Sequence, residues 1–389
     1  MVLFLHNRYR TTGGEERVVE DLLWLVREQM GEQAELLARD SSELGHGGAA
    51  LGLLRGGLQP QDVARAVRLS GARVLHAHNL QPSLGWRALA AARSAGARVV
   101  LHLHQYRLVC AIGVCFTRGA ECTRCHGRDT SPGVRLNCRG SLPEAVTYGA
   151  SLALWQKRLV EQADAVIVPS LFALERLREL GAPLPWERVH VLPPPLRTTA
   201  TTAPGGALPA DLADGKPYAL VVSRLAPEKG VDVAIDACRM ADMGLVIAGD
   251  GPDAAALRER GRGTDVRFLG RVDDDELSRL RAGAAIALAP SRSAETFGLA
   301  VAEAMAAGLP VAASRVGALP ELLEDDALVA PGDAAALAAA IDRLAGDRLV
   351  GDRGRARINA ICAPGIVAGE LAGIYDGDGR EAEASPTST

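Results

Sequence analysis

Two glutamates, Glu295 and Glu303, stand eight positions apart in a segment otherwise rich in small and apolar residues. The segment reads SRSAETFGLAVAEAMAAGLPVAAS over 291–314, and apart from Glu303 no charged residue follows Glu295 until Arg315. A carboxylate is costly to bury among apolar side chains when it has no partner. We therefore expect Glu303 to bind a ligand, as an acceptor for the hydroxyls of a vicinal diol.

The hydrophobic pattern predicts the elements that hold these glutamates. A strand is followed by a loop and by a helix that begins near Gly298. The backbone N–H groups of Phe297, Gly298 and Leu299 then lie at a helix N-terminus, which is a binding site for anions. The anion would lie between the group that meets Glu295 and the diol that meets Glu303. A sugar, a diphosphate and a ribose fit that order of groups.

A second set of polar residues comes directly after an expected strand at 218–222. It reads SRLAPEKG over 223–230, so Arg224 and Lys229 emerge where the strand ends and a helix opens. The chain has only three lysines, which makes a lysine in this loop informative. Its flexible point charge differs in kind from the planar fork of arginine. This pair is therefore a candidate site for an anionic ligand.

These segments resemble the signatures of the family-4 retaining glycosyltransferases. The E-x7-E signature of that family usually reads E-G-F-G-L-x-x-x-E-A-M-A-x-G-x-P-V, and Thr296 here replaces its first glycine. The resemblance implies that Arg224 and Lys229 hold the diphosphate of a nucleotide sugar and that Glu295 orients the sugar. The turn at Gly249 and Gly251 resembles the family's G-x-G-P motif, where glycines permit close backbone approach to a ligand.

The first half of the chain carries further polar residues at predicted strand ends. The loop TTGGEE over 11–16 resembles the family's G-G-x-E loop, which implies that Gly13 and Gly14 approach the donor phosphate and the acceptor. Two strands read LHAHN and LHLHQ, and alternation places each histidine pair on one face of its strand. The resemblance maps His104 onto the histidine that contacts the reacting sugar, with Gln105 in place of the family's aspartate. For His76 and His102, at the first position of each pair, we expect a place in the core without catalytic duty.

Five of the seven cysteines fall within 29 positions, between Cys110 and Cys138. Without a secretory leader, such clustering indicates a metal rather than disulfides. A four-thiolate zinc site is the expectation, and an iron–sulfur cluster or unligated thiols remain open. Some members of the resembling family carry a similar insertion, and that comparison implies Cys110, Cys122, Cys125 and Cys138 as the ligands. Cys115 would be spare and His126 a substitute, and such a zinc would be structural and not catalytic.

An acidic run, Asp273 to Glu276, could pass for the D-x-D motif that binds a metal and a nucleotide in other glycosyltransferases. It lies directly before a periodic helix, and acidic residues in a first turn stabilise the helix dipole. We therefore interpret the run as a helix cap. With Arg224 and Lys229 for the diphosphate, no catalytic metal is expected.

The order of predicted elements gives two halves of alternating strands and helices, which indicates the α/β class. The resemblance implies two Rossmann-like doubly wound parallel-sheet domains that face across a cleft, the GT-B architecture. The expected strands are 2–5, 73–77, 99–103, 165–168 and 189–192 in the first half, and 218–222, 245–248, 266–269, 285–289, 311–313 and 328–329 in the second. The expected divisions are an acceptor-side domain at 1–195 with a Cys-rich insertion at 105–140, a linker at 196–214, a nucleotide-sugar-binding domain at 215–365, a C-terminal helix at 366–376 and a disordered tail at 377–389.

Composition limits the class of protein. The chain has 389 residues, 48% hydrophobic and 23% charged, which is typical of globular domains. A net charge of −4 argues against a nucleic-acid partner. The apolar start at 1–5 is too short for a secretory leader, and we expect no apolar run long enough to span a bilayer. A cytoplasmic location is expected, with peripheral contact at the inner membrane face left open.

The function that these residues predict is transfer of a sugar, with retention, from a nucleoside diphosphate sugar to a carbohydrate, glycolipid or small-molecule acceptor. High Ala, Gly and Arg content suggests a setting such as polysaccharide assembly in a GC-rich bacterium. Two alternatives remain. A nucleotide-sugar epimerase of the same fold would need acid and base carboxylates that the sequence does not place. A zinc-stabilised scaffold with a degenerate nucleotide site would not need the complete set of Arg224, Lys229, Glu295 and Glu303.

Overall fold

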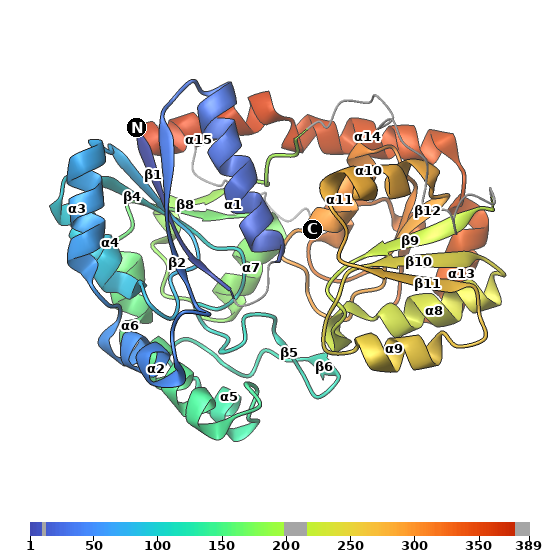
Figure 1. The fold of residues 1–389 in the computed structure, drawn as a ribbon, viewed down its shortest axis with the longest axis horizontal. Helices are drawn as coiled ribbons and strands as arrows, with labels where there is room; N and C mark the ends of the chain where they lie inside the picture. Colours follow the sequence, from blue (N-terminus) through green and yellow to red (C-terminus); the bar gives the residue numbers. More distant parts are fainter. Residues whose placement is uncertain (10–12, 198–215, 378–389) are drawn as a thin grey trace, which may run out of the picture. The chain divides into compact units, whose positions relative to one another are not determined.

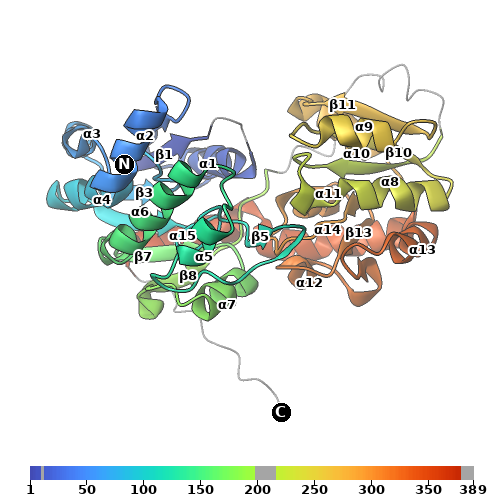
Figure 2. The same ribbon diagram turned by 90° about the horizontal axis from the view of Figure 1, so that it is seen from below.

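The computed structural model describes residues 1–9, 13–197 and 216–377. The chain divides into two compact units. Unit 1 contains Met1–Thr117, Cys122–Pro195 and the segment that begins at Pro364, and unit 2 contains Arg118–Glu121 and Leu196–Ala363. In each unit, helices flank a parallel sheet (Figures 1 and 2).

Unit 1 is built on a six-stranded sheet in the order β2-β1-β3-β4-β7-β8. All of its strand pairs are parallel. The strands are β1 (Val2–Arg8), β2 (Ala34–Asp40), β3 (Val74–Ala77), β4 (Arg98–His102), β7 (Ala165–Val168) and β8 (Val189–Val191). The two-residue strand β5 (Phe116–Thr117) lies in the Cys-rich segment of unit 1, whereas the next strand, β6 (Ala120–Glu121), belongs to unit 2. The first β1 residues and all of β7 are buried, as expected for strands covered on both faces.

The helices of unit 1 connect these strands. They are α1 (Gly14–Trp24) with the π-helical turn Leu25–Gln29, α2 (His46–Arg55), α3 (Pro60–Ser70), α4 (Gly85–Ser94), α5 (Ser131–Arg135), α6 (Leu142–Glu161), α7 (Leu171–Glu179) and α15 (Pro364–Asp376). Helix α3 has Pro60 in its first turn and ends at Gly71, whose φ of 64° is left-handed, so both ends match ordinary start and stop signals.

Unit 2 repeats this design with the order β11-β10-β9-β12-β13-β14, again parallel throughout. Its strands are β9 (Tyr218–Val222), β10 (Gly244–Ala248), β11 (Val266–Gly270), β12 (Ile286–Ala289), β13 (Val311–Ser314) and β14 (Leu328–Val329). Its helices are α8 (Val231–Met240), α9 (Ala254–Arg260), α10 (Asp274–Gly283), α11 (Leu299–Ala306), α12 (Leu319–Leu322), α13 (Ala334–Leu344) and α14 (Arg348–Cys362). Short 3-10 turns cover Pro227–Lys229 and Asp325–Ala327.

The predicted strands all occur, with bounds that differ by no more than three residues. Several elements were missing from the prediction, namely β2, β5, β6, α12 and α14. The edge strand β2 is mostly half-exposed and reads AELLARD, so it lacks the continuous apolar run of a central strand. Helix α14 was not expected either. The predicted linker at 196–214 and tail at 377–389 lie almost entirely outside the described residues.

One helical stretch, Arg348–Asp376, is long and apolar enough by length and composition to cross a membrane, so the expectation of no such run was wrong. The stretch comprises α14 and α15, which belong to different units. Ile358 and Cys362 are buried in unit 2, whereas Leu371 and Tyr375 are buried in unit 1. Core helices pass the same test, so this observation is weak support for a span.

Candidate functional site

In unit 2, the loop between β12 and α11 positions Glu295 at the end of a strand. Gly298 caps α11 with a φ of 98°, a left-handed conformation that glycine adopts without strain. The next turn of chain, after β13, holds the loop in place, because Ala318 N–H donates to the Glu295 carbonyl at 2.9 Å. A Cβ on Gly317 would lie 2.3 Å from the Glu295 backbone. Gly317 is thus a positioning residue that the motif did not reveal.

The Glu295 carboxylate binds two neighbouring side chains. Lys229 Nζ lies 2.6 Å from Glu295 Oε1, and Ser291 Oγ donates to the same oxygen at 2.6 Å. Burial raises the pKa of Glu295, but the charge of Lys229 and these hydrogen bonds outweigh it, so the net pKa is lowered. Arg224 contributes a smaller effect in the same direction. Glu295 is therefore a carboxylate that is kept ionised by cations on a neighbouring loop.

The loop after β9 supplies those cations. Arg224 forms an ion pair with Glu228, which is itself buried. The Glu228 carbonyl accepts hydrogen bonds from the backbone N–H groups of Arg292 (2.8 Å) and Ser293 (3.3 Å). These bonds join the Arg224–Lys229 loop to the Glu295 loop. The structure therefore brings together Arg224, Lys229 and Glu295, as the sequence predicted, and adds Glu228, whose place next to Lys229 in SRLAPEKG was the only sequence signal.

Glu303 lies in the second turn of α11, where its carboxylate forms an ion pair with Arg281 of α10. The two side chains are 18% and 13% exposed. The inference that Glu303 is buried without a protein partner is therefore wrong. Its partner comes from another helix, 22 positions earlier in the chain, and no local spacing could show that. A ligand that binds the Glu303 carboxylate must therefore compete with Arg281 for it.

Gly249 and Gly251 form the turn after β10. A Cβ on Gly249 would lie 1.9 Å from the Ser223 carbonyl oxygen, and one on Gly251 would lie 2.3 Å from that of Leu225. The close approach that these glycines permit is thus to the neighbouring β9 loop. Their contribution to a donor site is to place the Arg224 loop.

The acidic run before α10 is a helix cap, as interpreted from the sequence. The Asp273 carboxylate accepts a hydrogen bond from the Glu276 N–H at 2.8 Å, and Asp274, Asp275 and Glu276 occupy the first turn.

In unit 1, the start of α1 brings a second set of polar side chains to the end of β1. Gly13 is the N-cap, and its N–H donates to Glu16 at 2.8 Å. Glu15 instead accepts a hydrogen bond from the Tyr9 hydroxyl at 2.8 Å and from Gln105 Nε2 at 3.1 Å. The predicted glycine loop therefore exists at Gly13, whereas Thr11 and Thr12 lie outside the described residues. Tyr9 and Glu15 were not predicted.

Four histidines of β3, β4 and the turns after them are stacked in two hydrogen-bonded pairs. His76 Nε2 lies 3.2 Å from His102 Nδ1, and His78 Nδ1 lies 2.8 Å from His104 Nε2. The pairs stack on one another, with ring centroids 4.5 Å apart for His76 and His78 and 4.2 Å apart for His102 and His104. Each strand thus presents its histidines on one face, as predicted. His76 also contacts the Tyr375 hydroxyl of α15 at 2.7 Å.

Burial keeps these imidazoles neutral. It lowers the pKa of His76 to about 3 and, together with the neighbouring rings, lowers the pKa of His78 and His102 well below the ordinary value.

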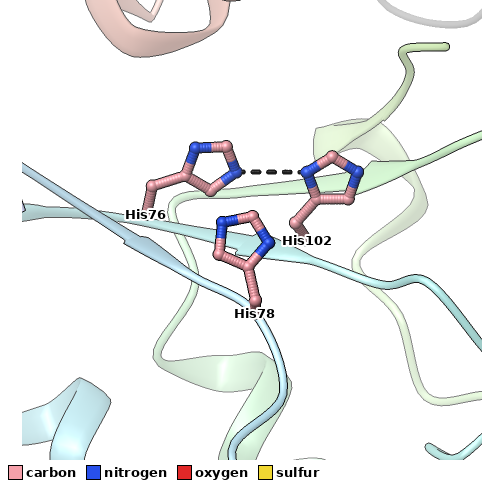
Figure 3. Close-up of side chains that lie close together, drawn as sticks. All are labelled: His76, His78 and His102. Atoms are coloured by element: carbon pink, nitrogen blue, oxygen red, sulfur yellow. Dashed lines mark hydrogen bonds between the residues drawn. The ribbon is translucent and has the colours of Figure 1, made fainter. Parts of the chain in front are cut away.

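Nitrogens of His76, His78 and His102 lie within 4.8 Å of one another, close enough to suggest a metal (Figure 3). However, the His76 and His102 nitrogens face each other at 3.2 Å with ring planes 9° apart. This contact is a hydrogen bond, and it occupies two of the nitrogens that a metal would need as ligands.

His104 and His78 line a pocket that lies entirely within unit 1. Its lining includes the polar side chains of Tyr9, Glu15 and Gln105, together with residues of α2, α4 and α6, among them Leu152, Trp86 and Trp155. Several buried polar atoms of the lining have no hydrogen-bond partner among the described residues: His78 Nε2, Gln81 Oε1, Trp86 Nε1, Arg107 Nε and Gln156 Oε1. A ligand with several hydroxyl groups would satisfy such a mixture of donors and acceptors.

The five clustered cysteines line one cavity of unit 1, and all are free thiols. Cys110 accepts a hydrogen bond from the Cys115 thiol, which lowers the pKa of Cys110 to about 6 although burial raises it. Cys115 therefore lies among the predicted ligands, and geometry does not single it out as spare. His126 does not line this cavity. Among the described residues, no three of these sulfur atoms lie within 4.8 Å of one another.

Two family descriptions match the chain, one for each unit. Residues 9–195 match the glycosyl transferase 4-like domain, and residues 216–347 match the glycosyl transferases group 1. Alpha-D-kanosaminyltransferase of Streptomyces kanamyceticus is 32% identical over 248 residues, covering 58% of this chain and 63% of that protein. Phosphatidyl-myo-inositol mannosyltransferase of Mycobacterium leprae is 40% identical over 125 residues, covering 30% of this chain and 33% of that protein. Against several curated relatives, the match thus spans a third of their length or less.

Solved structures share the fold of this chain. Sucrose-phosphate synthase of Thermosynechococcus elongatus superimposes with a TM-score of 0.66 at 21% identity, over 97% of this chain and 98% of that chain. HepE of Anabaena, solved with UDP and glucose, gives 0.63 at 19% identity, over 95% and 98%. These likenesses confirm the predicted fold class of two Rossmann-like parallel-sheet domains. With a family description matched in each unit, the chain belongs to the group 1 and 4-like glycosyltransferases, the family that its sequence motifs resembled.

Proposed function

We propose that this protein transfers a sugar from a nucleoside diphosphate sugar to a hydroxyl group of a carbohydrate, glycolipid or small-molecule acceptor, with retention at the anomeric carbon. The observation that carries the proposal is the joined pair of loops in unit 2. They hold Arg224, Lys229 and Glu295 beside the N-terminus of α11 at one edge of the sheet. Open α/β sheets bind ligands at this edge, beyond the carboxyl ends of their strands.

The chemistry follows from these charges. Arg224, Lys229 and the N–H groups at Gly298 would stabilise the charge that develops on the leaving diphosphate, without a catalytic metal. That phosphate would accept the proton of the acceptor hydroxyl on the same face of the sugar, which gives retention without a protein nucleophile. Glu295 would orient the sugar hydroxyls, and His104 would act near the reacting carbon. The names of similar proteins support a nucleotide-sugar donor, because HepE was solved with UDP-glucose and another relative is described as GDP-mannose-dependent.

The proposal is tested by donor binding and then by turnover. Thermal shift with a panel of UDP-, GDP- and ADP-sugars identifies the donor, because binding to the folded state raises its apparent stability. Release of the nucleoside diphosphate should then require an acceptor. Epimerisation of the sugar without release of the nucleoside diphosphate would identify an epimerase. A protein whose thermal stability does not respond to any nucleotide sugar would be a scaffold.

A pair of variants decides between the two roles open to Glu303. We expect Glu303→Ala to weaken binding of the nucleoside diphosphate. The ribose hydroxyls of the nucleotide would lose the carboxylate that accepts their hydrogen bonds, at a cost of about 1–3 kcal/mol. Arg281→Ala is the matched control, since it breaks the same ion pair but leaves the carboxylate. Calorimetry should show weakened affinity for Glu303→Ala only. Equal affinity in both variants and the parent would assign Glu303 to the ion pair alone.

We also propose that the cysteine cavity holds one structural zinc, bound by Cys110, Cys122, Cys125 and Cys138. The support is the chemistry of the side chains around this cavity. Five free thiols line it, and zinc prefers thiolate ligands. A zinc bound there would fasten the Cys-rich segment to the rest of unit 1.

Purified protein should contain about one zinc per chain by mass spectrometry. A Cys122→Ser, Cys125→Ser double variant should lose the metal, and the segment should become protease-sensitive, because two thiolates cannot close a tetrahedral site. Nucleotide affinity in unit 2 should stay unchanged. Cys115→Ser is the control and should retain zinc. Loss of zinc in this control would show that Cys115 is one of the ligands. A parent protein that contains no zinc would refute the site.

A further inference from the structure

Exposed apolar side chains gather on two helices of unit 1. Among the described residues, ten large apolar side chains are exposed, and half of them lie on α2 and α6. We call this set the α2/α6 face, which consists of Leu51, Leu54, Leu142, Val146 and Leu154, between 43% and 58% exposed. Single exposed apolar residues are ordinary, whereas a group of them marks a contact with another molecule.

The two helices lie side by side along the length of α2 (Figure 1). At their starts, His46 Nδ1 lies 3.8 Å from Glu144 Oε1. At the end of α2, Ser151 Oγ donates to the Leu53 carbonyl at 3.0 Å, and Trp155 Nε1 donates to the Leu54 carbonyl at 3.1 Å. The exposed leucines of α2 therefore adjoin the exposed residues of α6, which recur at intervals of four or eight positions along that helix.

Cations and tryptophans border one end of this face. Arg55 ends α2, and Lys157 and Arg158 follow Leu154 on α6, all three exposed. The Arg158 guanidinium lies 5.4 Å from the ring centroids of both Trp86 and Trp155. Long cationic side chains and tryptophans beside apolar residues suit the interface of a bilayer, where the charges meet anionic headgroups.

The inner sides of the same helices form a wall of the unit 1 pocket. The pocket is lined from α2 and its C-terminal end by Gly52, Leu53 and Gly56. From α6 it is lined by Leu152, Trp155, Gln156 and Leu159. An acceptor held by the pocket would thus lie directly beneath the helices that carry the exposed apolar side chains. The apolar part of this wall suits a hydrocarbon chain, and the unpartnered polar atoms suit hydroxyl groups.

We propose that the α2/α6 face docks on the surface of an anionic lipid bilayer, and that the pocket takes its acceptor from that bilayer as a hydroxyl-bearing lipid. The second part rests on the proposed transferase function, whereas the docking does not. The bilayer is favoured over a second copy of the chain because the tryptophans and cations that border the face suit the interface and the anionic headgroups of a bilayer. The apolar side chains would enter the interface while Arg55, Lys157 and Arg158 remain with the headgroups.

Vesicle flotation of the full chain tests the docking. We expect the protein to float with phosphatidylcholine vesicles that contain phosphatidylglycerol, and less with phosphatidylcholine alone. A Leu54→Glu, Leu154→Glu double variant should lower the bound fraction at least about tenfold, because it replaces buried apolar contact with repulsion from the headgroups. Neither leucine lines the pocket. The control is Met240→Glu, Leu349→Glu in unit 2, where the side chains are 63% and 71% exposed, and it should float like the parent.

Failure of the parent to float, or equal flotation of both double variants, would overturn the proposal. Light scattering provides a further check, because a dimer that the Leu54→Glu, Leu154→Glu variant dissociates would assign the face to a second copy. Donor binding measured by thermal shift on the same preparations separates the two proposals. A parent that binds a nucleotide sugar but does not float refutes the docking alone, and one that floats without binding any donor refutes the transferase.

Discussion

Replacement of Lys229 by alanine should lower kcat/KM about 30-fold or more, a loss of roughly 2 kcal/mol of transition-state stabilisation. Two effects combine. The leaving diphosphate loses a positive charge, and Glu295 loses the ammonium 2.6 Å from its carboxylate. Burial raises the pKa of Glu295, and Lys229 is the main group that opposes it. Without the lysine, the pKa of Glu295 should rise, so the acid limb of the pH profile of kcat/KM should move to higher pH.

The control for this variant is Lys216→Ala, which removes an exposed lysine outside the paired loops. It should have the activity and the pH profile of the parent. Lys229→Arg adds a second comparison, because it keeps the charge but changes its shape. Turnover of Lys229→Ala close to that of the parent would show that the Lys229–Glu295 pair is a surface feature. A lower kcat/KM without a shift of the acid limb would separate the diphosphate role from the effect on Glu295.

The donor half of the site was predictable because its residues are local in sequence. Arg224 and Lys229 lie in one loop after a strand, and Glu295 lies three positions before a helix cap, so spacing alone orders them. What spacing could not show is how the charges are paired. Glu303 looked unpartnered because Arg281 belongs to a different helix, and Gly317 supports Glu295 from a turn that no motif includes.

The pocket of unit 1 was less predictable for a physical reason. Its lining comes from elements far apart in sequence, such as Tyr9 after β1, Trp86 in α4 and Gln156 in α6. Each of these residues has an ordinary place in its own helix or loop, and only packing brings them together. The histidines were the exception, because alternation along β3 and β4 fixes their common face. Their pairing across strands, however, depends on the register of β3 against β4.

The buried histidines should make unit 1 lose stability as the pH falls from 7.5 to 5.5. In the folded state the pKa of His76 is about 3, and those of His78 and His102 are also well below 6.5. In the unfolded chain each histidine titrates near 6.5, so in this window the unfolded state binds protons that the folded state does not. The sign follows directly, since falling pH favours the state that binds more protons. His76 contributes about 1.4 kcal/mol over these two pH units, and His78 and His102 add to the loss in the same direction.

Urea unfolding followed by tryptophan fluorescence measures this loss in unit 1 alone, because all four tryptophans of the chain lie there, at Trp24, Trp86, Trp155 and Trp186. The pKa of Glu16 is lowered from 4.5, so that carboxylate titrates below the window. A His76→Asn, His102→Asn variant should lose less stability than the parent over the same window, by about 1.4 kcal/mol or more. His46→Asn, at a side chain 81% exposed, is the control and should behave like the parent. An unfolding free energy of the parent that is equal at pH 7.5 and 5.5 would mean that the stacked imidazoles take up protons without unfolding, and thus that they are not held neutral by burial.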